Sequence, residues 1–169
     1  NVNTVDTSGT KGTQAFSIAN ATSAGDIDLS GAAAATITGS VYADTIDITS
    51  SGNVDHNITS GTGADVVNIA IKNGYVTSAN IDAETINYTV AVGEDITLTG
   101  VNNTATTAIT LAGGNSLSTF TTAADGIVNQ LTSFDASGFG GNVVLKSTKN
   151  IIDSTVSFKA GALTTDEIE

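Results

Sequence analysis

The sequence contains no cysteine, proline, methionine or tryptophan, and it has no arginine, since all five basic residues are lysines. Without cysteine, the chain cannot use disulfides for stability. Without proline, every residue keeps the backbone N–H that a β-ladder requires. The absence of arginine argues against an enzyme that acts on acidic sugars, which would be expected to carry basic side chains in its cleft. Gly, Ala, Ser, Thr, Asn and Asp dominate what remains, with Ile, Val and Leu as the main large apolar residues.

Positive charge is also scarce, and the net charge is −12. This charge argues against binding to nucleic acid, which requires cations for the phosphates, and against adhesion to an anionic membrane surface. No apolar run approaches the roughly 18 residues that a membrane-spanning helix needs, so no membrane insertion is expected. Disorder is disfavoured because 40% of the residues are hydrophobic, many of them β-branched.

A short unit recurs along the chain: an apolar residue, a polar one, a second apolar one, and then Thr, Ser or Ala. This alternation predicts strands with one buried face. The clearest copies begin at Ile27, Ile46, Val67, Ile86, Ile96 and Ile109. Weaker strands are predicted at Thr36–Thr38, Asn57–Thr59, Tyr75–Thr77 and Asp95–Thr97, and one short helical turn is considered for Ala123–Leu131.

The spacing of these units predicts the fold. Ile46 follows Ile27 by 19 residues, and Val67 follows Ile46 by 21. A fixed period near 20 residues is typical of a stacked architecture. We therefore predict an all-β, parallel two-sheet β-solenoid with one repeat per turn. The buried residues are expected to include Ile46, Ile48, Val67, Ile69, Ile86 and Ile109.

A β-sandwich is the alternative, because its strands also recur every 8–12 residues or so. The solenoid is favoured because the same unit returns in phase. Such a thin core is expected to hold Ile, Val, Leu and Ala, with little room for aromatic rings. Residues 1–169 are expected to form one segment of a longer polypeptide, because the chain begins with Asn1, contains no methionine and carries no targeting signal. Residues 1–20 are expected to be an irregular lead-in and residues 115–169 to form less regular turns.

In a solenoid, the middle residue of each unit faces outward in a column. That column would contain Asp28, Asp47, Asn68, Asn87 and Thr110. Stacked strands lie about 4.8 Å apart, so Asp28 and Asp47 would repel each other unless a cation or solvent screens them. Asn and Thr ladders are favourable without an ion.

The strongest local motif is the stretch from Ser60 to Asn68, SGTGADVVN, with a weaker copy from Gly39 to Asp47. It resembles the nonapeptide G-G-x-G-x-D-x-U-x of repeats-in-toxin (RTX) proteins. Those proteins hold calcium between motifs on successive turns. The resemblance therefore implies a calcium site formed by Asp44, Gly61, Gly63 and Asp65. The alternative is that these are turn residues of a solenoid without ions.

A second resemblance covers more of the chain, from about residue 26 to residue 145. It rests on AETINYT, ITLAGG, LTSFDASG and GNVVL, which begin at Ala83, Ile109, Leu131 and Gly141. These stretches resemble the repeats of RTX-related bacterial surface-layer proteins. The resemblance implies a structural protein, secreted to the bacterial cell surface, that assembles with itself into a lattice and also contacts cell-surface polysaccharide. In DASG, a turn whose Asp135 and Ser137 side chains cap backbone amides is favoured over a metal site.

Enzymatic function finds little support in the sequence. His56, the single histidine, has no nucleophile beside it and is interpreted as an exposed polar residue. Paired carboxylates of a polysaccharide hydrolase are conceivable at Asp44 and Asp65 or at Asp26 and Asp28. We expect no catalytic residues. The alternatives to a surface-layer scaffold are a ligand-binding or adhesive solenoid and, last, a polysaccharide-active enzyme.

Overall fold

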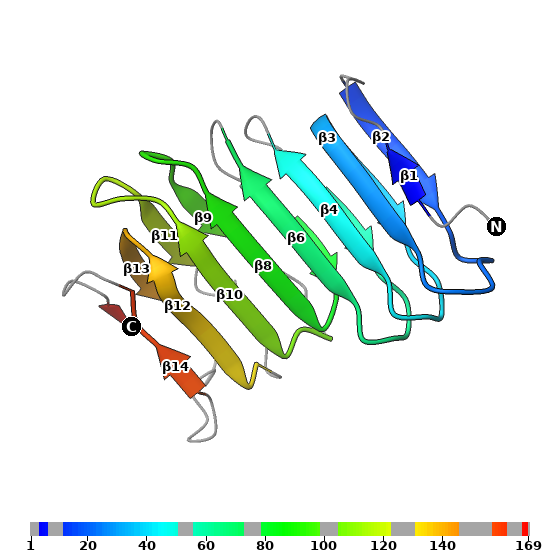
Figure 1. Cartoon of the computed structure of the whole chain (residues 1–169). Coiled ribbons are helices and arrows are strands. Elements are labelled where there is room, and N and C mark those ends of the chain that lie inside the picture. The colour runs from blue at the N-terminus through cyan, green and yellow to red at the C-terminus, as the bar shows by residue number, and fades with distance from the viewer. Residues whose placement is uncertain are drawn as a thin grey trace.

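The computed structural model describes residues 4–6, 12–50, 56–72, 79–98, 105–122, 131–145, 157–161 and 167–168. These residues form β-strands and turns, with no helix among them, and the strands that pair do so in parallel (Figure 1). The predicted parallel β-solenoid is confirmed. No helix in the described ranges is long and apolar enough to cross a membrane.

The strands stack as two walls, and we call the chain from one first-wall strand to the next a coil. The first wall contains β1 (Thr4–Asp6), the start of β3 (Asp26–Thr38), β4 (Thr45–Ser50), β6 (Val66–Ile71), β8 (Thr85–Val90), β10 (Ala108–Gly113), β12 (Ser133–Phe139) and β14 (Ser157–Lys159). The second contains β2 (Gly12–Ser17), the end of β3, β5 (His56–Thr59), β7 (Ala79–Asp82), β9 (Ile96–Leu98), β11 (Thr119–Thr122), β13 (Asn142–Leu145) and β15 (Glu167–Ile168).

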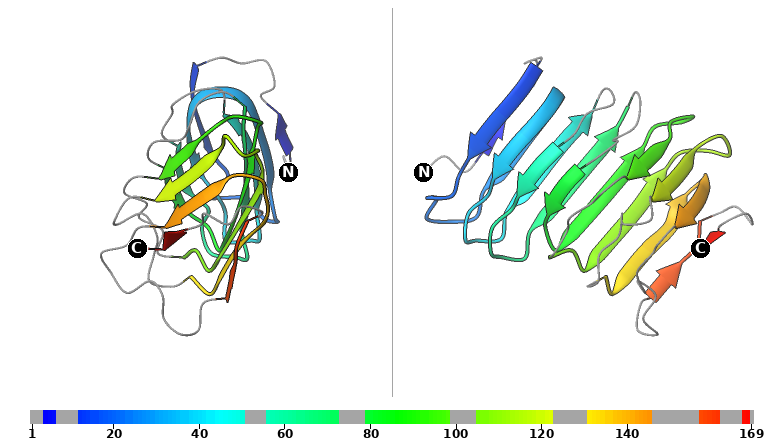
Figure 2. Two further views of the ribbon diagram at one scale, coloured as in Figure 1. Left: turned by 90° about the vertical axis from the view of Figure 1, so that its left-hand side faces the viewer. Right: turned by 180° about the vertical axis from the view of Figure 1, so that it is seen from behind.

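The long strand β3 belongs to both walls, since its 13 residues pair with β4 at one end and with β5 at the other. Figure 2 shows the strands arranged around a common interior. The second wall is divided, because β9, β11, β13 and β15 form a separate four-stranded sheet. β7 ends at Asp82, just before the first-wall strand β8 begins at Thr85, whereas β9 begins at Ile96, soon after β8 ends at Val90.

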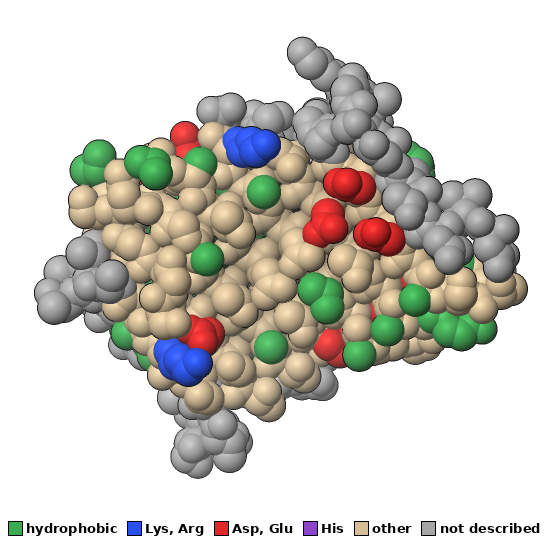
Figure 3. Space-filling view, in the orientation of Figure 1, with side chains coloured by type: hydrophobic (Ala, Val, Ile, Leu, Met, Phe, Trp, Pro, Cys, Tyr) green, Lys and Arg blue, Asp and Glu red, His purple; other side chains and the backbone are tan. Residues whose placement is uncertain are grey.

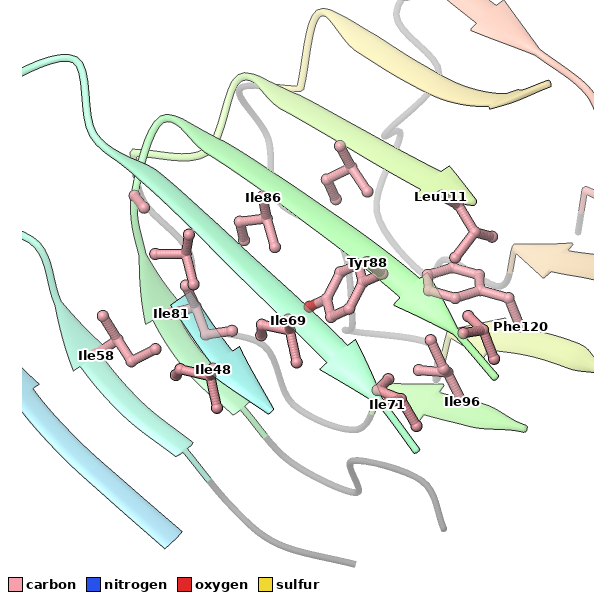
Figure 4. Packing of buried hydrophobic residues seen from close by; sticks show 14 of the residues in the cluster. Ile48, Ile58, Ile69, Ile71, Ile81, Ile86, Tyr88, Ile96, Leu111 and Phe120 are labelled. Carbon is pink, nitrogen blue, oxygen red and sulfur yellow. The ribbon is translucent and has the colours of Figure 1, made fainter. Parts of the chain in front are cut away.

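Alternation of buried and exposed residues explains why these segments are strands. In β4 and β6, every second side chain is buried. The first-wall register places Ile27, Ile46, Val67, Ile86, Ile109 and Phe134 in one inward column, each at most 4% exposed. All six predicted core residues are buried. Burying one such side chain contributes roughly 1.5–3 kcal/mol, so this column is a main source of stability. Figure 4 shows Ile86 of this column among other buried core residues, such as Ile69 and Tyr88.

The expectation that aromatic rings have little room in the core is wrong for the C-terminal half. Tyr88, Phe120, Phe134 and Phe139 are fully buried there. The ring centroids of Tyr88 and Phe120 lie 6.1 Å apart, and those of Phe120 and Phe134 lie 5.7 Å apart. The cause is coil length: equivalent residues are 19 apart at Asn68 and Asn87 but 25 apart at Thr107 and Thr132. Longer coils enclose a wider interior that rings can fill.

The other expectations concern the two ends of the chain and the weaker strands. The expected irregular lead-in contains β1 and β2, which both pair with β3. After residue 115 the strands β11 to β15 continue the stack, and irregularity is found as a bulge where β10 and β12 change register. Three of the four weaker strands are confirmed as the end of β3, β5 and β9. The fourth, Tyr75–Thr77, and most of the helical turn at 123–131 lie outside the described residues.

Candidate functional site

The turns that precede the first-wall strands stack into one edge of the solenoid. Asp44, Asp65 and Glu84 each come directly before β4, β6 and β8, and together we call them the carboxylate corner. Backbone bonds align them, since Val66 N–H donates to the Asp44 carbonyl at 2.9 Å and Thr85 N–H donates to that of Asp65 at 3.1 Å. The structure thus brings the predicted residues Asp44 and Asp65 together on adjacent coils.

Each carboxylate of the corner accepts the backbone N–H of the equivalent residue one coil earlier. Gly25 N–H donates to Asp44 Oδ1 at 2.7 Å, and Asp44 N–H donates to Asp65 Oδ1 at 2.7 Å. Asp65 N–H donates to Glu84 Oε2 at 2.9 Å. Hydrogen bonds to a charged acceptor are stronger than neutral ones, and these bonds satisfy amides that the turns bury. The corner carboxylates therefore fasten neighbouring coils to one another.

Asp44 is saturated with donors. Besides the Gly25 N–H, its Oδ1 accepts the Ser40 hydroxyl at 3.0 Å, and its Oδ2 accepts the Ser40 N–H at 2.6 Å. The side chain is 1% exposed. This carboxylate thus holds its own turn closed while it bonds the preceding coil.

Gly61 and Gly63, the other predicted site residues, allow the turns at 39–44 and 60–65 to touch. Gly61 has a φ of +110°, and a Cβ there would lie 1.7 Å from the Ser40 carbonyl oxygen. A Cβ on Gly63 would lie 2.6 Å from the carbonyl oxygen of Tyr42. The Ser40 carbonyl accepts the Thr62 N–H at 3.3 Å. These glycines serve close backbone stacking.

Asp65 is the exceptional member of the corner. It is fully buried, and its Oδ2 has no hydrogen-bond partner among the described residues. The Ser60 hydroxyl does not fill this role, because its single proton is donated to the Asp82 carbonyl. Burial raises the pKa of Asp65, and the nearby charges of Glu84 and Asp44 raise it further, against the N–H bond from Asp44.

The same geometry tests the fit to calcium, which takes six to eight oxygen ligands. The carboxylate oxygens of Asp44 face N–H and O–H donors, so Asp65 Oδ2 is the open acceptor of the two predicted carboxylates. Across the described ranges, no group of three or more His, Cys, Asp or Glu side chains is arranged to hold a metal. The two predicted aspartates therefore supply one open carboxylate oxygen, and a cation at Asp65 would need its other ligands from elsewhere.

The sequence interpretation missed Glu84 and the two residues that continue the corner in the C-terminal half. There the Thr107 hydroxyl donates to the Glu84 carbonyl at 3.2 Å, and the Thr132 hydroxyl donates to the Thr107 carbonyl at 3.0 Å. The sequence could have shown them by their position, because each lies directly before a first-wall strand.

The predicted outward column is confirmed and extends further. Asp28, Asp47, Asn68, Asn87 and Thr110 are register partners, and the column continues to Asp135 and Lys159 toward the C-terminal end. Amide side chains join it, since Asn68 Nδ2 donates to Asp47 Oδ1 at 2.6 Å and Asn87 Nδ2 donates to Asn68 Oδ1 at 2.8 Å. Figure 3 shows acidic side chains gathered on the part of this face toward the N-terminal end.

Asp135 behaves largely as predicted for the DASG stretch. Its Oδ1 accepts the Ser137 N–H at 3.0 Å and the Ser137 hydroxyl at 2.6 Å, but this occurs at the bulge within β12 rather than in a turn. Lys159 Nζ donates to Asp135 Oδ2 at 2.6 Å. The bonds from Lys159 and Ser137 lower the pKa of Asp135 to about 2.

The interpretation of His56 as an exposed residue is wrong. It lies at the start of β5 and is buried, because His56 and Ile58 occupy the inward positions of the strand. Asp26 and Asp28, considered as paired carboxylates, lie on the outward face of β3 and are exposed.

Comparisons with known proteins gave no match, whether against protein-family models, curated proteins or solved structures. The functional argument therefore rests on the arrangement described above.

Proposed function

We propose that the chain is a structural component of a bacterial surface layer, a secreted repetitive scaffold that assembles with itself. The observation that carries this proposal is the use of the corner carboxylates. Asp44 and Asp65, the acidic residues with the strongest motif signal, are 1% and 0% exposed and bond the backbone of adjacent coils. These hydrogen bonds hold neighbouring coils together and make the stack rigid.

The same burial weighs against the enzymatic alternative. A general acid, base or nucleophile must reach its substrate. Asp44 and Asp65 offer no exposed oxygen for this purpose, and the single histidine is also buried. The scaffold proposal needs no accessible reactive group.

An adhesive function would be favoured by a uniform outward array of Thr or aromatic side chains. The central outward column instead mixes Asp, Asn and Thr. Among the described residues, the exposed large hydrophobics are Val41, Tyr42, Val92 and Leu117, and all four lie in turns. The flat face therefore lacks the regular pattern that binding a repetitive ligand would use.

The test is direct observation of assembly. The purified chain is followed by light scattering and negative-stain electron microscopy as its concentration rises, with calcium and with a chelator. We expect concentration-dependent growth of ordered particles. A chain that stays monomeric at every concentration and in both ionic conditions would refute the scaffold proposal. Turnover of polysaccharides that an Asp28→Asn variant abolishes would favour the enzyme.

A further inference from the structure

One edge of the solenoid carries no charge over three neighbouring turns. These turns, at residues 19–24, 39–43 and 60–64, contain no Asp, Glu or Lys, and we call them the neutral edge. Backbone hydrogen bonds join the coils at these turns. The carboxylates that follow two of the turns, Asp44 and Asp65, are buried. Two molecules that each carry a net charge of −12 repel each other, so they meet at the lowest electrostatic cost through a surface without charge.

The neutral edge also exposes two large apolar side chains. Val41 and Tyr42 are 62% and 42% exposed, and both belong to its middle turn. The turn on the next coil presents mostly backbone beside them, because Gly61 and Gly63 have no side chain. The two turns touch, since a Cβ on Gly63 would lie 2.6 Å from the Tyr42 carbonyl oxygen. An exposed aromatic side chain therefore lies next to a stretch of bare backbone.

We propose that a second copy of this chain packs on the neutral edge about a two-fold axis that runs across the stack, level with the gap between the turns at 39–43 and 60–64. This axis reverses the stacking direction, so Tyr42 of each copy lies against Gly61 and Gly63 of the other. The inference rests on the proposed scaffold function and names one of its contacts. A two-fold contact closes as a dimer, so the growth of a layer uses a further contact elsewhere.

Charge favours this antiparallel arrangement over a parallel one. The coil after the neutral edge places Asp82 and Glu84 at the same edge of the solenoid. With the axis across the stack, that coil faces the uncharged turn at 19–24 of the other copy. With the axis along the stack, each coil would face its own equivalent, and Glu84 would meet Glu84. Like charges that face each other weaken association.

Loss of the exposed ring tests the contact. Analytical ultracentrifugation should show a dimer of the wild-type chain, and Tyr42→Ser should weaken it about tenfold or more, because both copies lose the ring. Leu117→Ser is the matched control, since Leu117 is 76% exposed in the turn after β10 and not at the neutral edge. It should leave the dimer unchanged. Equal association of wild type and Tyr42→Ser would overturn the inference.

The absence of cysteine allows disulfide trapping of the orientation. Tyr42→Cys and Thr62→Cys are introduced in separate full-length chains, which are mixed under mild oxidation. We expect a mixed dimer, because Thr62 lies between the two glycines that face Tyr42 of the other copy. Leu117→Cys replaces Tyr42→Cys in the control mixture and should give no mixed dimer. Dimers of the Tyr42→Cys chain alone would overturn the antiparallel arrangement in favour of the parallel one.

The outcomes separate this inference from the function on which it rests. Ordered assemblies that form equally from wild type and from Tyr42→Ser would overturn the inference while leaving the scaffold function standing. A wild-type chain that stays monomeric at every concentration, with the folded state verified by circular dichroism, would overturn both.

Discussion

At the scale of single residues, the corner shows why a buried charge is retained in a stack of neutral strands. Asp65 Oδ1 accepts the Asp44 N–H, a donor that would otherwise be buried without a partner. Its other oxygen is buried without a bond among the described residues. Oδ1 therefore stabilises the fold, whereas Oδ2 costs free energy because it is buried without a partner. Substitutions of Asp65 that keep or remove the Oδ1 acceptor distinguish these two effects.

At pH 7, Asp65→Asn should destabilise the protein less than Asp65→Ala does. Asparagine keeps the Oδ1 acceptor and removes the charge beside Glu84, whereas alanine leaves the Asp44 N–H unpaired at a cost of about 1–3 kcal/mol. Urea denaturation in the presence of a chelator measures both. Equal destabilisation by the two variants would contradict this account of the site.

The pH dependence of Asp65→Asn gives an independent check. The pKa of Asp65 is raised in the folded state, so the unfolded chain loses this proton first as pH rises. Wild-type stability should fall as pH rises from the ordinary value of 3.8 through the folded pKa. The stability of Asp65→Asn relative to wild type should therefore increase as pH rises from about 4. Asp135, whose pKa is lowered to about 2, contributes oppositely, because its stabilising effect is lost as pH falls below 3.8. Measuring both chains across this range removes the shared Asp135 effect.

The hydroxyl of Tyr88 is a second buried polar group whose cost can be measured by substitution. Its ring fills the core against Phe120, but its hydroxyl is buried with no partner in the described part of the chain, and burial raises its pKa. Tyr88→Phe should raise the free energy of unfolding by about 1 kcal/mol, because an unpaired polar atom is removed. Tyr42→Phe, at a partly exposed turn, is the control and should change little. A loss of stability in Tyr88→Phe alone would reveal a partner for this hydroxyl.

At the scale of elements, the turns contain the glycines that allow neighbouring coils to stack closely. Gly61 and Gly93 both have positive φ, of +110° and +79°. They differ in surroundings, since a Cβ on Gly61 meets the Ser40 carbonyl whereas one on Gly93 meets nothing within 4 Å.

Gly93→Ala should therefore cost about 1–2 kcal/mol, the usual penalty of a left-handed conformation. Gly61→Ala should cost clearly more, because the stacked turns must also move apart. Thermal melting of the two variants measures the difference. Gly93→Ala reports the cost of the backbone conformation alone, and Gly61→Ala reports that cost together with the clash against the Ser40 carbonyl. Similar melting temperatures would show that the turns at Ser40 and Gly61 can move apart at little cost in free energy.

The strands could be predicted from the sequence because their buried column repeats in phase. Ile46, Val67 and Ile86 return at nearly constant intervals, and the outward residues between them follow automatically. The division of the second wall was not predictable in this way. The division depends on where in each coil the second-wall strand begins. The turns that set this position leave no regular pattern of apolar residues in the sequence. Glu84 was overlooked because a corner residue is defined by its neighbour on the next coil rather than by a local pattern.

The aromatic core and His56 were misjudged for a related reason. The expected core was based on coils of constant length, whereas their lengthening toward the C-terminus creates the space that Phe120 and Phe134 occupy. His56 was judged by its polarity alone, although its position two residues before Ile58 places it on the inward face. In both cases packing overrode the preference of the residue type.

At the scale of the whole molecule, the net charge of −12 is the dominant long-range feature. Any cation reduces the resulting self-repulsion, so a general effect of calcium must be separated from a bound ion. The comparison is thermal melting with millimolar calcium or a chelator, on wild type, on Asp65→Ala and on Asp28→Asn. Asp28→Asn removes one charge at an exposed position and leaves the corner intact.

A calcium ion held at Asp65 should stabilise wild type and Asp28→Asn by about 2.7 kcal/mol at a hundredfold excess over Kd, but not Asp65→Ala. An equal small rise in all three proteins would indicate screening alone. The absence of any shift would mean that the corner functions through its hydrogen bonds without an ion.

The stacking direction also determines how the molecule responds to tension. The termini lie at opposite ends of the stack, so a pull between them acts along the inter-coil hydrogen bonds (Figure 1). Those bonds then open one coil at a time, since each coil contacts only its neighbours. Each opened coil of 19 to 25 residues releases roughly 60–90 Å of chain. A layer built from such segments would yield stepwise under load, absorbing mechanical work as it lengthens and reforming coil on coil when the load is removed.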